Sequence, residues 1–367
     1  MTIHEERTLY HCTALESILT EIYLDNASGE LTIALPFAYT AMALVDDSRA
    51  LRRIERASPP LPAGHVRLRV HACGVCRTDL HQIDGDLPSR GLPRVPGHEI
   101  VGTVLECGPD TRLHRIGDRV GVPWLAGTCG ACLQCRRQRE NLCRAASFTG
   151  LTVDGGYAEY AVAREDFTFA LPTGYSDVEA APLLCAGLIG FRALRMLPDA
   201  EVIGLYGFGA AAHLVAQVAL AEGRRVFAFT RPGDGPAQSL ALRLGVQWAG
   251  DSTQAPPQTM DGALLFAPVG ALVPRALQSV GPAGTVVCAG IHMSDIPAFP
   301  YRWLWEERAV RSVANLTRAD AVDFLGWAGR HRLTLSTTAY ALADANRALD
   351  DLRAGRVAGA AVLQCGP

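Results

Sequence analysis

The stretch EVIGLYGFGAAAHLVAQVALAEGRRVFAFTR, residues 201–231, combines the signals of a strand, a tight turn, a helix and a second strand. Its apolar run at 202–206 predicts a buried strand, and residues 210–221 carry an apolar helical face. A further short strand is expected at 226–229. A strand, a helix and a strand in this order predict a parallel α/β unit.

The turn of this unit has the pattern G-x-G-x-x-A, formed by Gly207, Gly209 and Ala212. The glycines let the backbone approach a pyrophosphate at the helix N-terminus, and the small third residue lets the helix pack closely on the strand. A bare G-x-G is weak evidence in a chain with 36 glycines. The strand before it and the helix after it make it a predicted dinucleotide site.

The end of the second strand, FAFTRPGD at 227–234, bears on the choice of cofactor. Many NAD-binding chains place an acidic residue there to bind the ribose 2′-hydroxyl. Here Thr230 occupies that position and Arg231 follows, a pair suited to a 2′-phosphate. Arg231 is alternatively a solvated residue at a strand end. The sequence therefore favours NADP and leaves NAD open.

Four cysteines lie close together in TCGACLQCRRQRENLC, residues 128–143. Disulfides would close very small loops, and the chain is long enough to fold without them. Bacterial ferredoxins share the C-x2-C-x2-C spacing, but their fourth gap is three residues with a Pro after it. In this chain the last gap is seven residues and Arg144 follows. Cys129, Cys132, Cys135 and Cys143 are therefore predicted to hold a closed, structural zinc ion.

A second group of potential ligands is spread over HACGVCRTDLH (71–81), VPGHEIVG (95–102) and APLLCAG (181–187). Cys76, His98 and Cys185 would supply two thiolates and one imidazole, the ligand set of a zinc ion that keeps a position open for chemistry. Spacing alone supports this weakly, because a lone cysteine in an apolar run is more often a small buried residue.

Composition narrows the classes of function. The chain has 367 residues, 49% of them hydrophobic, and a formal net charge of -3 without long basic runs, which argues against binding nucleic acid. The most apolar stretch, residues 31–45, contains Pro36 and is too short to span a bilayer. Eleven clustered cysteines fit metal ligation in a reducing, cytoplasmic compartment better than a disulfide framework.

In this order, GVCRTDLH, PGHEIVG, the four-cysteine segment, APLLCAG and the G-x-G-x-x-A unit resemble the zinc-dependent alcohol dehydrogenases of the medium-chain dehydrogenase/reductase family. The resemblance covers residues 42–367. It implies two zinc ions per chain, a catalytic one at Cys76, His98 and Cys185 and a structural one at the four clustered cysteines. It also implies a zinc-assisted, reversible hydride transfer between a primary or secondary alcohol and NAD(P), giving an aldehyde or ketone.

The same resemblance assigns roles around the catalytic zinc. Thr78 is expected to touch the substrate oxygen, and His81 to end a proton relay that runs through the cofactor ribose. Asp79 is expected to orient His98, Glu99 to lie behind the metal, and Arg77 to contact the pyrophosphate. Trp124 and Leu125 resemble pocket residues that favour small or medium apolar alcohols.

The fold implied is α/β: a Rossmann doubly wound parallel sheet for the cofactor (172–314), and a mostly β, GroES-like catalytic domain (42–171 with 315–367) carrying the structural zinc. Residues 1–41 are expected to be an extension of unknown role or the product of a misassigned start. A homodimer or homotetramer is implied. Two rival readings are a zinc-free quinone or enoyl reductase, which would lack the ligand trio, and a non-catalytic zinc or redox-sensing protein, which would not need Thr78 and His81.

Overall fold

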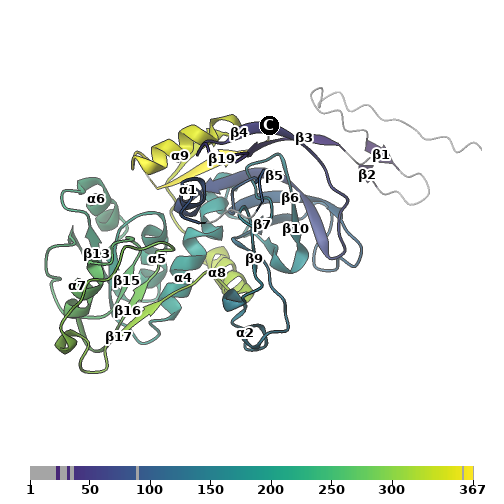
Figure 1. Ribbon diagram of the computed structural model, residues 1–367. Helices are drawn as coiled ribbons and strands as arrows, with labels where there is room; N and C mark the ends of the chain where they lie inside the picture. Colours follow the sequence, from purple (N-terminus) through teal and green to yellow (C-terminus); the bar gives the residue numbers. More distant parts are fainter. Residues whose placement is uncertain (1–21, 25–30, 34–36, 88–90, 358, 367) are drawn as a thin grey trace, which may run out of the picture.

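The computed structural model describes residues 22–24, 31–33, 37–87, 91–357 and 359–366. Two large sheets organise them (Figure 1). We call residues 202–312, which carry the parallel sheet, the parallel-sheet domain. Residues 38–170 and 337–364 carry the other sheet, which is antiparallel except for the pair β18 (Thr337–Ala341) and β19 (Ala360–Gln364), and we call them the antiparallel-sheet domain. Helices α4 (Ala186–Arg195) and α8 (Arg318–Arg330) lie between the two.

The parallel sheet grows outward from β12 (Val202–Tyr206), all of whose residues are buried. Its strands follow the order β14–β13–β12–β15–β16–β17, so the chain runs to one edge and then returns past β12 to the other. This is the strand order of a doubly wound dinucleotide-binding sheet. The other strands are β13 (Arg225–Thr230), β14 (Trp248–Asp251), β15 (Met260–Leu265), β16 (Val280–Cys288) and β17 (Ala309–Ser312).

Helices α5 (Ala210–Ala221), α6 (Gly235–Arg243) and α7 (Leu272–Ser279) connect these strands. The predicted strand and helix at 202–206 and 210–221 coincide with β12 and α5, and β13 extends the predicted second strand by one residue at each end. Tyr206 and Phe229 stack at 4.1 Å within the core on one side of the sheet. The parallel α/β expectation is confirmed.

The second sheet has the order β11–β7–β6–β5–β19–β18, with β10 also paired to β5. Because β18 and β19 come from the end of the chain, the C-terminal segment completes the sheet that the first half began. Its strands are β5 (His65–Val75), β6 (Ile100–Cys107), β7 (Arg119–Val122), β10 (Tyr160–Arg164), β11 (Phe169–Ala170), β18 (Thr337–Ala341) and β19 (Ala360–Gln364).

Shorter elements complete the fold. They are the strand pairs β1 (Ile22–Leu24) with β2 (Leu31–Ile33), β3 (Ala38–Ala43) with β4 (Arg52–Ala57), and β8 (Leu125–Gly127) with β9 (Ser147–Phe148), and helices α1 (Arg77–Ile83), α2 (Leu133–Arg136), α3 (Asp177–Ala180) and α9 (Ala345–Arg353). No helix within the described ranges is long and apolar enough to cross a membrane.

The antiparallel-sheet domain includes residues that the sequence analysis assigned to the extension. Strand β3 starts at Ala38, and Phe37 is buried with its ring 4.8 Å from that of Tyr160. The last residues of the predicted 1–41 extension therefore belong to the antiparallel-sheet domain. Burial against β10, far along the chain, explains why the local pattern did not reveal it. Most of the extension lies outside the described residues.

Candidate active site

Helix α1 begins where strand β5 ends, and this junction places three of the expected site residues. Cys76 is the N-cap, and its backbone N–H donates to Asp79 Oδ2 at 2.8 Å, which closes the first turn. The buried Thr78 has its hydroxyl 3.7 Å from Cys76 Sγ. The junction of strand and helix thus places the Cys76 thiol and the Thr78 hydroxyl side by side.

Asp79 also orients His98, which lies in the loop two residues before β6 begins. His98 Nδ1 and Asp79 Oδ1 are 3.1 Å apart, and Tyr157 donates its hydroxyl hydrogen to Asp79 Oδ2 at 3.2 Å. His98 is fully buried, and its other ring nitrogen, Nε2, has no hydrogen-bond partner among the described residues. A buried polar atom without a partner is costly, so a ligand at Nε2 would resolve the cost.

Cys185, the N-cap of α4, completes the group from a distant part of the chain. Its Sγ lies 3.7 Å from Cys76 Sγ, and ligand atoms of Cys76, His98, Glu99 and Cys185 all lie within 4.8 Å of one another. A tetrahedron with Zn–S bonds of about 2.3 Å has an edge of about 3.8 Å. The spacing of the two thiols therefore fits a shared zinc ion.

The electrostatics of the group agree with cation binding. The hydrogen bond from the Cys185 thiol lowers the pKa of Cys76 well below its usual range. Burial alone would lower the pKa of His98, but the adjacent Asp79 carboxylate outweighs it and raises that pKa. Burial raises the pKa of Glu99, whose carboxyl group lies against Gly74 behind the ligands. A thiolate, a second thiol and an oriented imidazole form a donor set for zinc.

His81 and Trp124 border this centre. His81 lies in the last turn of α1, its Nδ1 2.8 Å from Asp86 Oδ2 and its ring centroid 5.3 Å from that of His292. Trp124 meets the ring of His98 edge-on at 4.8 Å and stacks on Phe148 at 5.2 Å. Leu125, on β8, is completely buried and packs in the larger hydrophobic core.

The glycine-rich turn is open where a cofactor would approach. Gly207 has φ +88°, and a Cβ there would lie 2.7 Å from the backbone nitrogen of Ala267, so only glycine fits. Gly209 caps α5, and a Cβ built on it has no described atom within 4 Å. Ala212 is fully buried. The turn therefore leaves room for a phosphate at the start of α5. Arg77, the residue expected to contact the pyrophosphate, is exposed at the start of α1.

Thr230 and Arg231 differ in what they offer to a cofactor. Thr230 is buried, and its hydroxyl donates to the carbonyl of Arg231 at 3.1 Å while accepting from Gln238 Nε2 at 3.0 Å. The Arg231 side chain is 83% exposed and lies 3.6 Å from Asp234. Of the two, Arg231 has the freedom to contact a bound group.

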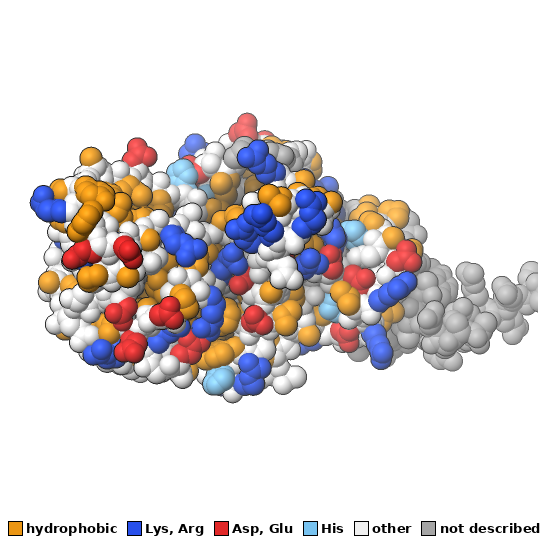
Figure 2. All heavy atoms as spheres, turned by 90° about the horizontal axis from the view of Figure 1, so that it is seen from below, with side chains coloured by type: hydrophobic (Ala, Val, Ile, Leu, Met, Phe, Trp, Pro, Cys, Tyr) orange, Lys and Arg blue, Asp and Glu red, His pale blue; other side chains and the backbone are white. Residues whose placement is uncertain are grey.

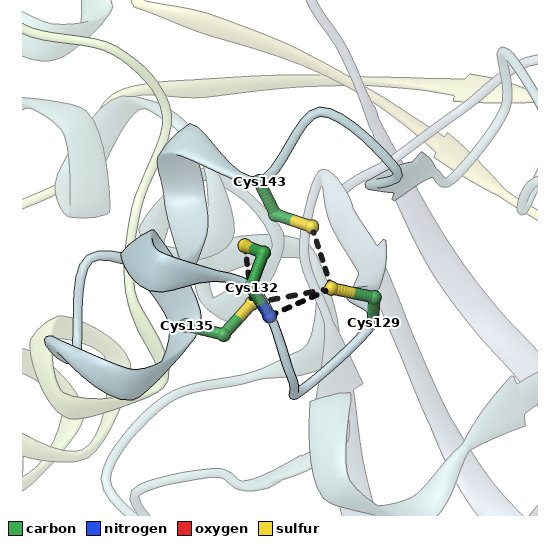
Figure 3. Close-up of side chains that lie close together, drawn as sticks. All are labelled: Cys129, Cys132, Cys135 and Cys143. Carbon is green, nitrogen blue, oxygen red and sulfur yellow. Dashed lines mark hydrogen bonds between the residues drawn. The ribbon is translucent and has the colours of Figure 1, made fainter.

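The four clustered cysteines converge on one point (Figure 3). The Sγ–Sγ distances are 3.5 Å for Cys129–Cys143, 3.5 Å for Cys132–Cys135 and 3.9 Å for Cys129–Cys135, again near the edge of a zinc–thiolate tetrahedron. Backbone N–H groups of Ala131 and Cys132 lower the pKa of Cys129 to about 6. No disulfide joins two cysteines among the described residues.

The chain matches the family model of the alcohol dehydrogenase GroES-like domain over residues 62–173. It is 48% identical over 326 residues to a probable alcohol dehydrogenase, AdhA, of Mycobacterium tuberculosis, which spans 86% of this chain and 93% of that protein. The chain belongs to the zinc-dependent alcohol dehydrogenases of the medium-chain dehydrogenase/reductase family. An alcohol dehydrogenase of Geobacillus stearothermophilus is 33% identical over 325 residues, covering 86% of this chain and 95% of the relative.

Solved structures agree with this assignment. The cobalt- and zinc-bound alcohol dehydrogenase of Pyrobaculum aerophilum superposes with a TM-score of 0.81 at 25% identity, covering 89% of this chain and 99% of the other. The expected fold, a doubly wound parallel sheet with a GroES-like domain, is confirmed. The dehydrogenase is thus an oxidoreductase that interconverts alcohols and carbonyl compounds with NAD(P).

Three residues of the dehydrogenase site escaped the sequence analysis. Tyr157 supports Asp79, and no spacing rule links GGYAEY to a residue 78 positions earlier. Asp86 follows His81 by five residues, a signal that could have been noticed in HQIDGD. His292 comes from the parallel-sheet domain, and only the fold brings it to His81.

Proposed function

We propose that this dehydrogenase holds two zinc ions per chain, a catalytic ion at Cys76, His98 and Cys185 and a structural ion at the four clustered cysteines. The observation that carries the catalytic site is the buried His98 Nε2, which has no partner among the described residues and stands beside two thiols 3.7 Å apart. The convergence of the four other thiols supports the structural site. The Pyrobaculum relative, whose structure is described as cobalt- and zinc-bound, supports metal binding in this fold.

When bound, zinc supplies a Lewis acid for the substrate oxygen and nicotinamide supplies the hydride acceptor or donor. The chain positions and protects the reacting groups. The Thr78 hydroxyl, beside Cys76 Sγ, hydrogen-bonds the substrate oxygen and accepts its proton. His81, partly exposed, exchanges that proton with solvent. Asp79 keeps His98 in one orientation, and Glu99 stays behind the ligands.

Substrate size is set on the side of Trp124. Its indole ring meets the ring of His98 edge-on and stacks on Phe148, which makes one wall of the site apolar and broad. We propose small or medium apolar primary and secondary alcohols, and the matching aldehydes and ketones, as substrates. An apolar wall offers no partners for the extra hydroxyl groups of a sugar or polyol.

We propose NADP as the preferred cofactor. The 2′-phosphate would meet the guanidinium of Arg231, which is exposed and only loosely paired with Asp234 at 3.6 Å. Arg77 would contact the pyrophosphate, while Gly207, Gly209 and Ala212 shape the turn beneath it. Thr230 would support this loop through its internal hydrogen bonds.

We propose a homo-oligomer whose interface includes β17, which ends the parallel sheet among the described strands. Large exposed apolar side chains lie near it in sequence: Ile291, Ile296, Tyr301 and Trp305. Figure 2 shows apolar side chains exposed at this end of the molecule. The free thiols of the described cysteines support a reducing, cytoplasmic setting, which we also propose.

The deciding experiment measures zinc content and initial rates of the purified protein on a panel of alcohols, aldehydes and ketones. Each substrate is tried with both cofactors, before and after treatment with a zinc chelator. We expect two zinc ions per chain, chelator-sensitive turnover and a lower KM for NADP than for NAD. Chelator-insensitive turnover in a zinc-free protein would contradict the zinc mechanism, and a preference for NAD would contradict only the cofactor assignment.

A further inference from the structure

The surroundings of His81 determine which of its ring nitrogens carries hydrogen. Asp86, just beyond the end of α1, places Oδ2 2.8 Å from His81 Nδ1. The hydrogen bond from His81 lowers the pKa of Asp86, with the nearby His292 and Arg49 adding to the effect. An ionised carboxylate only accepts hydrogen bonds. His81 must therefore donate from Nδ1, which leaves the lone pair of the neutral ring at Nε2.

The location of the pair fits a proton exit. His81 is on α1, four residues after Arg77 and three after Thr78. The ring of His292, on the loop after β16, lies 5.3 Å from that of His81, so the two domains meet at this histidine. The His81 side chain is 20% exposed and that of Asp86 is 41% exposed, which gives water access to the ring.

We propose that Asp86 is a positioning residue of the dehydrogenase, which holds His81 in the Nδ1–H tautomer so that Nε2 accepts the proton released from the substrate. In alcohol oxidation the O–H bond of the donating hydroxyl breaks as an Nε2–H bond forms, giving an imidazolium whose charge the Asp86 carboxylate balances. Water then takes the proton from Nε2. This proposal rests on the proposed function, because it requires His81 to act in proton transfer.

The test combines Asp86→Asn, Asp86→Glu and His81→Gln. An asparagine amide can donate to Nδ1 and favour the opposite tautomer, in which Nε2 carries hydrogen and cannot accept. General acid–base groups contribute about 100-fold to 10,000-fold in rate, and partial exposure places His81 at the low end. We expect Asp86→Asn to lower kcat by about 3-fold to 10-fold with little change in KM, and Asp86→Glu to restore most of it.

The matched control is Asp84→Asn. Asp84 lies two residues earlier in the same loop but pairs with Arg353 at 2.9 Å rather than with His81. The Asp84→Asn substitution removes one carboxylate from the same surface and should leave kcat unchanged. In the His81→Gln background, Asp86→Asn should have no further effect. An equal loss in both backgrounds would show a purely structural role and overturn the proposal.

A second readout does not depend on activity. Nitrogen-15 NMR of histidine-labelled resting protein distinguishes the tautomers, and the signal of His81, one of 10 histidines, is assigned by its loss in His81→Gln. We expect the Nδ1–H form in the unmodified chain and the Nε2–H form in Asp86→Asn. An unchanged tautomer would overturn the positioning role even in a zinc-dependent enzyme. Full activity of His81→Gln would refute the relay and this proposal while leaving the zinc sites intact.

Discussion

The strongest sign of a catalytic metal is one nitrogen atom, the buried Nε2 of His98, which has no hydrogen-bond partner among the described residues. Asp79 engages the other ring nitrogen, and Tyr157 and the backbone N–H of Gly97 engage Asp79 in turn, so the imidazole cannot turn away from the two thiols. Support of this kind raises the basicity of a histidine ligand and fixes its direction. The residues behind the ligands therefore matter nearly as much as the ligands themselves.

Replacing Cys185 by alanine tests the ligand set. The variant should retain only the structural zinc, because a thiolate is lost from a site of three protein ligands. A Lewis acid contributes several kcal/mol to such a reaction, so kcat/KM should fall by about 1000-fold or more. Zinc per chain, far-ultraviolet circular dichroism and initial rates measure the outcome. Cys288→Ala, at a buried cysteine of the parallel sheet, is the control and should keep both ions and activity.

The role of Arg231 is tested by Arg231→Ser. Losing a guanidinium beside a phosphate removes a charge-assisted hydrogen bond of about 1.5 to 3 kcal/mol, so the KM for NADP should rise by about 10-fold to 100-fold. The KM for NAD, which has no 2′-phosphate, should change little. Arg225→Ser serves as the control, because Arg225 begins β13 whereas Arg231 directly follows its last residue. Equal changes for both cofactors would contradict a 2′-phosphate contact.

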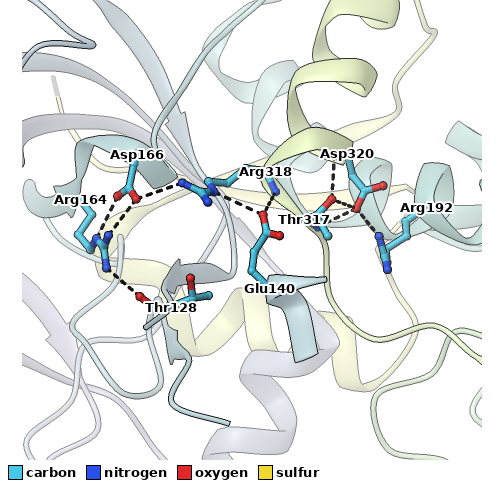
Figure 4. A network of polar contacts seen from close by, with 8 residues as sticks. All are labelled: Thr128, Glu140, Arg164, Asp166, Arg192, Thr317, Arg318 and Asp320. Carbon is cyan, nitrogen blue, oxygen red and sulfur yellow. Dashed lines mark hydrogen bonds and ion pairs between the residues drawn. The ribbon is translucent and has the colours of Figure 1, made fainter. Parts of the chain in front are cut away.

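At the scale of elements, the four-cysteine segment is joined to the helices between the domains. Figure 4 shows that Glu140 of this segment contacts Arg318 at the start of α8, and that Thr128 reaches the same arginine through Arg164 and Asp166. In the same turn of α8, Asp320 contacts Arg192 of α4. The buried Glu140 accepts from the backbone N–H of Arg318 at 3.0 Å and lies 3.4 Å from its Nε. A carboxylate at a helix N-terminus also interacts favourably with the helix dipole.

This connection predicts that Glu140→Gln destabilises the chain through α8. The substitution keeps the shape but removes the charge from a buried hydrogen bond, which should cost about 1 to 2 kcal/mol of unfolding free energy. Hydrogen exchange should quicken in the first turn of α8, and the zinc content should stay at the unmodified value. Asp323→Asn, at an exposed carboxylate on the same helix, is the control. Unchanged exchange at 317–321 would disprove the coupling.

The elements that sequence predicted best are those with continuous local patterns. The first and last residues of strand β12 and helix α5 were predicted correctly. A five-residue apolar run marks the strand, an uninterrupted apolar face marks the helix, and a glycine turn separates them. The sequence analysis assigned residues 37–41 to the extension because Phe37 is buried against Tyr160 of β10, more than a hundred residues away, although β3 itself pairs with the nearby β4. The same cause, contact between residues far apart in sequence, hid Tyr157 and His292 from the sequence analysis.

At the scale of the whole molecule, the remaining question is how two copies meet. The outer edge of β17 has backbone N–H and C=O groups that could pair with a strand of a second copy. Apolar side chains near such an edge favour association. Trp305 and Tyr301 expose 60% and 68% of their surface, and their rings contact each other at 5.8 Å. Aromatic residues of this kind are enriched at interfaces, where truncating a central one costs about 2 kcal/mol or more of binding free energy.

Trp305→Glu should therefore weaken the oligomer, because it places a charge in the centre of the proposed apolar contact. A loss of about 2 kcal/mol or more raises the dissociation constant by about 30-fold or more. Sedimentation velocity over a range of protein concentrations would detect the shift toward monomer. Leu113→Glu is the control, because Leu113 is 64% exposed but lies on the antiparallel-sheet domain. An oligomer that resists Trp305→Glu yet dissociates in Leu113→Glu would contradict the β17 interface and place the contact on the antiparallel-sheet domain.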